Sequence, residues 1–299
     1  MTTGTTIPRG ANLRGSLWMI AAMAGFAVED ALLKSAALTL PVGEILILFG
    51  LGGAAVFAAL ATARGERLFT PDVLSTPMRV RAVFEVTGRL FYTLAIATIP
   101  LSAATVILQA TPLVVVAGAA LVFGERVGWR RWTAILVGLS GVVLIVRPGT
   151  EGFSALSILA ILGMLGFAGR DLASRAAPAS LGTAVLGVYG FLAVIVAGAA
   201  FSAWDGAAFV PPGGPAALAL SAAVLTGVAA YGCLMNAMRT GEVSAVTPFR
   251  YSRIVFGLAI GIAVFGERPD LLTYAGAGLI AVAGVFTLSR TRRAPPPQP

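Results

Sequence analysis

The sequence has no histidine, a single cysteine and a single lysine, and these absences exclude several kinds of site. Without histidine, Cys233 alone leaves no credible zinc, haem or disulfide site. Lys34 lies in an apolar stretch and not in a G-x-x-x-x-G-K-[ST] loop, so the chain has no phosphate cradle for ATP. We therefore expect no enzymatic activity, no metal and no cofactor, and nothing indicates an ATPase subunit.

Charged residues are also scarce, at 11% of the chain against 58% hydrophobic residues, and the mean hydropathy is +0.90. An ordinary soluble domain carries about 25% charged residues. The chain cannot cover itself with a wettable surface, so we expect an all-α integral membrane protein in a lipid bilayer. The net charge of +8 fits contact with anionic lipid headgroups, because no basic soluble domain exists to bind nucleic acid.

Long apolar stretches predict the membrane spans, since a transmembrane helix needs about 20 residues. These stretches are longer than the strands of a membrane β-barrel and do not alternate between apolar and polar residues, which favours helices. The first carries Glu29 and Asp30 and is too long for a signal-peptide core, so we expect a true first helix. The predicted helices are 17–38, 44–63, 79–99, 102–123, 132–147, 154–174, 182–203, 216–238, 244–265 and 271–289.

The chain repeats itself. The segment MAGFAVEDALLK at 23–34 recurs as MLGFAGRDLASR at 164–175. Further on, SAAT at 102–105 and FGER at 123–126 recur as SAVT at 244–247 and FGER at 265–268. A nearly constant spacing over separate blocks indicates that one segment was duplicated.

The arginines predict the orientation, because cytoplasmic loops of membrane proteins are enriched in arginine and lysine. With both termini in the cytoplasm, only Lys34, Arg147 and Arg268 lie at outer ends. The inner segments then hold Arg9, Arg14, Arg64, Arg67, Arg79, Arg81, Arg126, Arg130, Arg131, Arg175, Arg239, Arg290, Arg292 and Arg293. We expect a multi-pass protein of the inner (plasma) membrane.

We predict five helices in each copy of the repeat. Because five is an odd number, the two copies cross the membrane in opposite senses. The expected organisation is a cytoplasmic tail at 1–15, a first repeat at 16–148, a second repeat at 149–290 and a Pro- and Arg-rich tail at 291–299. Inverted repeats of this kind are typical of secondary transporters, whose substrate site lies near the midplane.

Two halves that each end in Ser-Ala-x-Thr and Phe-Gly-Glu-Arg segments resemble the drug/metabolite transporter superfamily, specifically its EamA-repeat branch, over residues 16–290. The second copy departs from the first at Glu242, in place of Pro100, and in the charged segment 249–253. These departures bear on the substrate and leave the fold unaffected. The resemblance implies export of amino acids and other metabolites, or exchange of small solutes, without nucleotide hydrolysis.

Charges inside a membrane are expensive and often functional. Asp30 with Lys34, and Asp171 with Arg175, are spaced to form ion pairs along one helical face. The repeat places one pair near the outer mouth and the other near the inner mouth. The pairs either anchor helix ends or act as symmetric gate elements.

Glu85 and Arg89 have the same spacing and predict a further ion pair. Arg250 and Arg253 share one face of their helix and have no acid nearby in sequence. Their counter-charge is either an acid on another helix (Glu29, Glu85 or Asp171) or a carboxylate of the substrate.

Polar and aromatic residues surround these charges and complete the expected substrate site. Pro112 and Pro248 interrupt their helices, either as packing kinks or to expose backbone groups to a cavity. The G-x-x-x-G at 257–261 predicts close packing against a neighbouring helix. The candidate substrate-binding residues are Arg250, Arg253, Tyr251, Arg89, Glu85, Gln109, Tyr92, Tyr231, Asn236 and Glu29.

The expected function is a secondary transporter that exports amino acids or similar small metabolites by alternating access. In this hypothesis Arg250 and Arg253 recognise a carboxylate of the small-molecule substrate. One alternative is an exporter of drugs or cationic compounds, recognised by Glu29 or Glu85. The other is a passive channel, although the sequence contains nothing like a selectivity filter.

Overall fold

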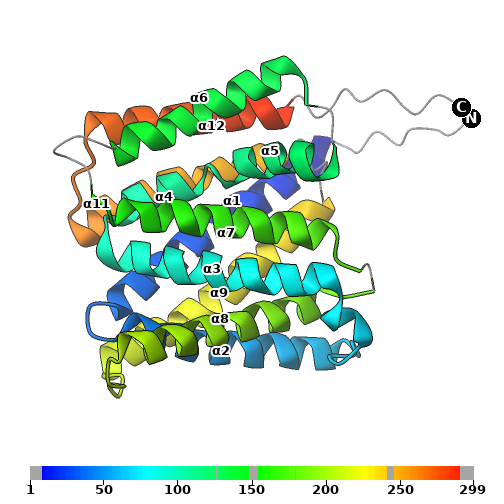
Figure 1. Ribbon diagram of the computed structural model, residues 1–299, viewed down its shortest axis with the longest axis vertical. Coiled ribbons are helices and arrows are strands. Elements are labelled where there is room, and N and C mark those ends of the chain that lie inside the picture. The colour runs from blue at the N-terminus through cyan, green and yellow to red at the C-terminus, as the bar shows by residue number, and fades with distance from the viewer. Residues whose placement is uncertain (1–8, 125–126, 148–153, 179, 241–245, 290–299) are drawn as a thin grey trace, which may run out of the picture.

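The computed structural model describes residues 9–124, 127–147, 154–178, 180–240 and 246–289 (Figure 1). These residues form helices and no strand. The first half contains α1 (Arg9–Ala36), α2 (Val42–Ala63), η1 (Pro71–Leu74), α3 (Thr76–Thr98), α4 (Leu101–Leu108), α5 (Thr111–Phe123) and α6 (Trp129–Val146). The second half contains α7 (Ser157–Arg175), α8 (Thr183–Asp205), α9 (Gly214–Thr240), η2 (Thr247–Tyr251), α11 (Ser252–Phe265) and α12 (Leu271–Ser289).

Two predicted helices are divided in the structure. The range 102–123 forms α4 and α5, with a turn at 109–110 between them, because Pro112 has no N–H to continue the helix. The hydroxyl of Thr111 donates to the free carbonyl of Leu108 at 2.5 Å instead. In the second half, Pro248 lies in the 3₁₀ segment η2, which precedes α11.

Eight helical segments of the described chain are long and apolar enough to cross a membrane. Helix α3 does not qualify because it carries Arg79, Arg81, Glu85 and Arg89, and the apolar part of α12 (Leu271–Thr287) is shorter than the others. The protein is therefore an all-helical, multi-pass membrane protein. The count of ten spans stays a prediction.

The helices form one bundle, with α6 and α12 along one edge, α2 and α8 along the opposite edge, and α1 and α9 crossing obliquely between them (Figure 1). Helix α1 begins and α12 ends at the same end of the bundle, which we name the terminal end. The other end, where α1 finishes, we name the Lys34 end.

Each main helix pair joins one helix from each half: α1 packs on α9, α2 on α8, α3 on α7 and α6 on α12. At one point the backbones of α3 and α7 come into direct contact. A Cβ atom on Gly166 would lie 2.4 Å from Cα of Gly88, so no larger residue fits at this crossing.

The apolar core is continuous towards the Lys34 end and divided towards the terminal end. The continuous cluster joins the ends of α1 and α3, the start of α2 and α9, and α4, through fully buried residues such as Ile45, Ile96 and Leu101. Towards the terminal end, separate small clusters hold the helix pairs together. One unites Met19 of α1 with Ala237 of α9, and another unites Phe57 of α2 with Val188 of α8.

A cavity of about 170 Å³ opens between α2, α8 and α9, where the core is divided. Arg64 of α2 lines it, which places it towards the terminal end. The packing is thus tight at the Lys34 end and looser at the terminal end. The remaining lining residues are Phe57, Leu60, Thr183, Ala184, Val228, Tyr231, Gly232, Met235 and Asn236.

Candidate functional site

Helices α1, α3 and α11 bring five polar side chains together, and we name them the central cluster: Glu29, Asp30, Arg89, Tyr92 and Arg253. Nη2 of Arg89 donates a hydrogen bond to Oε1 of Glu29, with a nitrogen–oxygen distance of 2.9 Å. The hydroxyl of Tyr92 and Nη2 of Arg253 both donate to Oδ2 of Asp30, at 2.9 Å and 2.5 Å. The second half contributes Arg253 and the first half contributes the other four.

The carboxylates of the central cluster are deeply buried. Glu29 is 3% exposed and Asp30 is 1% exposed. Removing a charge from water costs several kcal/mol, and a buried carboxylate persists only when it is paired and hydrogen-bonded. The guanidiniums of Arg89 and Arg253 match the two acids one to one, so the cluster has no net formal charge.

The central cluster does not use all of its hydrogen-bonding capacity. Oδ1 of Asp30, Nε of Arg89 and Nε of Arg253 are buried and have no hydrogen-bond partner among the described residues. The two guanidiniums instead lie over aromatic rings, Arg89 at 4.8 Å from the ring centroid of Phe49 and Arg253 at 5.4 Å from that of Phe26. Buried polar atoms without partners are uncommon, and they are the atoms that a polar ligand can satisfy.

A second group of charges, which we name the α3–α7 cluster, comprises Arg81, Glu85, Arg170, Asp171 and Ser174. Glu85 lies 3.4 Å from both Arg81 and Arg170, and Arg170 lies 2.8 Å from Asp171. Nε of Arg81 donates to the hydroxyl of Ser174 at 3.0 Å. Glu85 and Arg89 are one helical turn apart, so the two clusters adjoin along α3.

Comparison with known proteins identifies the family of the chain. The EamA-like transporter family model matches residues 13–147 and, a second time, residues 155–290. The chain belongs to the EamA-like transporter family. It is accordingly a membrane transporter of the drug/metabolite superfamily and not an enzyme.

This EamA transporter is similar to several curated transporters. The pseudopaline exporter CntI of Pseudomonas aeruginosa is 32% identical over 282 residues, which cover 93% of this chain and 97% of that protein. A riboflavin transporter of Rhizobium johnstonii is 27% identical, covering 71% of this chain and 70% of that protein. An S-adenosylmethionine uptake transporter of Rickettsia felis is 24% identical and covers 69% of each chain.

A protein of known crystal structure has the same fold as this EamA transporter. The two match with a TM-score of 0.64 and 22% sequence identity, over 94% of this chain and 98% of the other. At this identity the likeness supports the fold alone.

Two ion pairs predicted within single helices are not formed in the transporter. Asp30 pairs with Arg253 and not with Lys34, whose ammonium group donates to the carbonyl oxygens of Ile96 and Ile99. Glu85 and Arg89 likewise do not pair, since each has a partner on another helix. Glu85 pairs instead with Arg81 of its own helix and with Arg170 of α7, and Arg89 pairs with Glu29 of α1.

The predicted ion pair of Asp171 and Arg175 stays a prediction, because the Arg175 side chain lies outside the described part of the chain. Asp171 pairs with Arg170, the residue directly before it. Arg170 was missed as a candidate, although the repeat marks it. It stands where the first copy has Glu29, so the charge is reversed between the two copies.

The other candidate residues occupy different places. The side-chain amide of Gln109 donates to the backbone carbonyl of Arg250 at 2.7 Å, which joins the two interrupted helices. Arg250 forms no ion pair within the described part of the chain. Tyr251 packs against Gly284 of α12, while Tyr231 and Asn236 line the 170 Å³ cavity.

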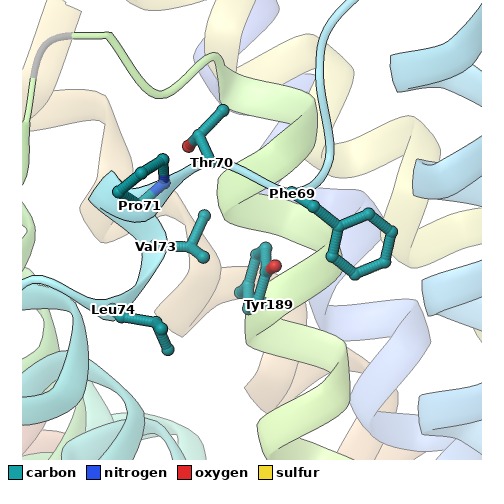
Figure 2. A pocket seen from close by; sticks show the side chains of 6 residues that line it. All are labelled: Phe69, Thr70, Pro71, Val73, Leu74 and Tyr189. Carbon is teal, nitrogen blue, oxygen red and sulfur yellow. The ribbon is translucent and has the colours of Figure 1, made fainter.

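A larger hollow of about 380 Å³ lies on the surface near η1 and is unrelated to these clusters. Figure 2 shows Tyr189 of α8 projecting between Phe69 on one side and Val73 and Leu74 on the other. Thr70 and Pro71 complete the lining, and no charged side chain takes part. The ionisable groups of the central cluster and of the α3–α7 cluster lie elsewhere, on α1, α3, α7 and α11.

Proposed function

We propose that the protein is a secondary transporter that exports amino acids or similar small metabolites across the inner membrane by alternating access. In this proposal ten transmembrane helices form two inverted repeats, at 16–148 and 149–290. The observation that carries the proposal is the central cluster, in which matched acids and arginines are buried with unused hydrogen-bonding atoms. The site lies at the junction of the two halves, as expected for inverted-repeat transporters.

The arrangement of the halves supports the inverted repeat. Helix α1 runs from the terminal end to the Lys34 end, and its repeat counterpart α7 runs the other way (Figure 1). The pair of α1 with α9 then has its counterpart in the pair of α7 with α3, as a two-fold axis in the membrane plane requires. Arginines gather at the terminal end, for example Arg64 and Arg79, which supports cytoplasmic termini.

The charge balance of the central cluster favours a zwitterionic substrate. An anion bound to Arg253 alone would leave Asp30 as an unpaired buried carboxylate, which is strongly destabilising. A zwitterion avoids that cost, because its carboxylate binds Arg253 while its ammonium group binds Asp30. The unpartnered Nε atoms of Arg253 and Arg89 offer further donors to the same carboxylate.

The relatives support a small-molecule substrate and leave its direction of transport to be tested. One relative is named as an exporter and another as an uptake transporter. The alternatives have less support. A cation bound to Glu29 or Glu85, the recognition charges of a cation exporter, would leave the arginine partner of that acid without a counter-charge. The continuous apolar core at the Lys34 end is unlike the open path of a channel.

The proposal is tested by transport into proteoliposomes and inside-out vesicles with a panel of labelled amino acids. We expect saturable counterflow, and we expect Arg253→Gln to weaken apparent substrate affinity about ten- to hundredfold, since it removes a charge-assisted hydrogen bond. Arg130→Gln, an exposed arginine on α6, is the matched control and should leave affinity unchanged. A non-saturating leak would instead support a channel.

Two results would count against the amino-acid proposal. Wild-type amino-acid affinity in Arg253→Gln would remove this residue as the carboxylate receptor. Counterflow of amines that lack a carboxylate, at undiminished rates in the same variant, would favour the cation exporter. Accumulation in inside-out vesicles reports export, whereas accumulation only in right-side-out vesicles reports uptake.

A further inference from the structure

The junction between α3 and α4 leaves backbone groups of both helices without helical partners. Helix α3 ends at Thr98 and α4 begins at Leu101, and Pro100 between them has no N–H. Ile99 is extended, with φ −116° and ψ 167°, as is usual before proline. The last carbonyls of α3 and the first N–H groups of α4 must therefore find partners elsewhere.

Lys34 of α1 supplies the partner for α3. Its Nζ donates to the carbonyl oxygen of Ile96 at 2.7 Å and to that of Ile99 at 2.8 Å, and it lies 5.4 Å from the ring centroid of Phe265. A cation at a helix C-terminus is stabilised by the partial negative charge there.

Glu267 supplies the partner for α4, and it comes from the other half of the protein. Its Oε1 accepts the N–H of Leu101 at 2.5 Å, and its Oε2 accepts the N–H of Ser102 at 2.9 Å. Gly266, with φ +63°, ends α11 and turns the chain back towards α4. A Cβ atom on Gly261 would lie 2.4 Å from Oε2 of Glu267, so glycine at this position makes room for the carboxylate.

We propose that Lys34 and Glu267 form a latch that holds the Lys34 end closed, and that the transport cycle releases Glu267 from α4 to open it. This inference rests on the alternating access of the proposed function. Glu267 joins the two halves at the end where the apolar core is continuous, and Lys34 holds the α3 side of the same junction. The latch is separate from the central cluster, whose acid Asp30 lies one helical turn before Lys34 on α1.

The chemistry of the latch suits repeated opening. Glu267 and Lys34 are both only partly buried, so water can replace their backbone partners when the halves separate. Releasing Asp30, by contrast, exposes a wholly buried carboxylate that needs a new counter-charge. The latch therefore sets how readily the end opens, and the central cluster responds to the substrate.

The test measures access to Ala104, which is fully buried beneath the junction in α4. Ala104→Cys is introduced with Cys233→Ser, and a membrane-impermeant thiol reagent is applied from each side. We expect Glu267→Gln to raise the labelling rate from the Lys34 side about ten- to hundredfold, because it weakens two charge-assisted hydrogen bonds. Lys34→Met should act in the same direction, and Glu267→Asp should restore part of the protection.

Glu44→Gln is the matched control. Glu44 is buried at the same end and accepts the N–H of Val210 at 2.9 Å, also across the two halves, but away from the junction. Unchanged labelling in a folded Glu267→Gln protein, or an equal rise in Glu44→Gln, would overturn the latch. Failure of the proposed function gives a different result. The wild type would then show no saturable amino-acid transport, whereas Glu267→Gln would still raise the labelling of Ala104→Cys.

Discussion

At the scale of the residue, both acids of the central cluster find their partners on other helices. Glu29 and Asp30 are neighbours on α1, yet their partners Arg89 and Arg253 come from α3 and α11. This arrangement gives each of two adjacent buried carboxylates its own guanidinium, and the two guanidiniums come from different helices. It also makes the pairing depend on how α1, α3 and α11 are placed relative to one another.

Removing one partner of the pair of Glu29 and Arg89 should destabilise the protein more than removing both. We expect Glu29→Gln or Arg89→Gln to lower the free energy of unfolding by about 3–5 kcal/mol, because the remaining charge is buried without a partner. The double variant Glu29→Gln with Arg89→Gln should recover part of that loss. Thermal unfolding in detergent micelles, analysed as a double-mutant cycle, measures the difference, and strictly additive losses would contradict the coupling.

At the scale of the element, glycines decide how closely the two halves approach. The G-x-x-x-G at 257–261 was predicted to pack closely, and it does so against α4, where a Cβ atom on Gly257 would lie 2.5 Å from Cγ2 of Thr105. Gly166 and Gly88 do the same for α7 and α3. These contacts set the spacing at which Glu85 of α3 can reach Arg170 of α7.

Gly166→Ala should therefore separate α3 from α7 and weaken the α3–α7 cluster. The added methyl group meets backbone atoms of Gly88, which cannot move aside without the helix. We expect a loss of about 1–3 kcal/mol in unfolding free energy. Gly278→Ala on α12 is the control, because its Cβ meets no atom within 4 Å and alanine is the better helix former. Equal stability of the two variants would argue that the crossing is not tight.

At the scale of the whole molecule, the two ends of the bundle differ. The Lys34 end has a continuous core and polar contacts between the halves, including that of Glu267 with Leu101 and that of Arg147 with Asp270. The terminal end has divided clusters and the 170 Å³ cavity. If the termini are cytoplasmic, as we propose, this arrangement corresponds to a transporter closed to the outside.

That orientation predicts which loops a reagent reaches in intact cells. Phe209, which is 56% exposed between α8 and α9, lies at the Lys34 end, and Phe69, which is 88% exposed, lies between α2 and α3 at the other end. In a Cys233→Ser background we expect an impermeant thiol reagent to label Phe209→Cys in intact cells. Phe69→Cys should react only after permeabilisation, and the reverse pattern would invert the topology.

The sequence by itself determined that the protein lies in a membrane, that it is helical and which family it resembles. Low charge and long apolar runs require a membrane, and the repeated segments mark two related halves. These properties follow from composition and from spacing along the chain, and they do not depend on which residues are neighbours in the folded protein. All five members of the central cluster were candidates from the sequence, because charged and polar residues stand out in apolar segments.

Only the tertiary structure decided which charges meet. Spacing along one helix predicted the pairs of Asp30 with Lys34 and of Glu85 with Arg89, and both predictions were wrong. The same applies to Glu267, which the sequence presents as part of a repeated Gly-Glu-Arg motif and the structure places on the N–H groups of α4. Opposite charges in a low-dielectric interior pair with the best-placed partner, and that partner is set by helix packing and not by distance along the chain.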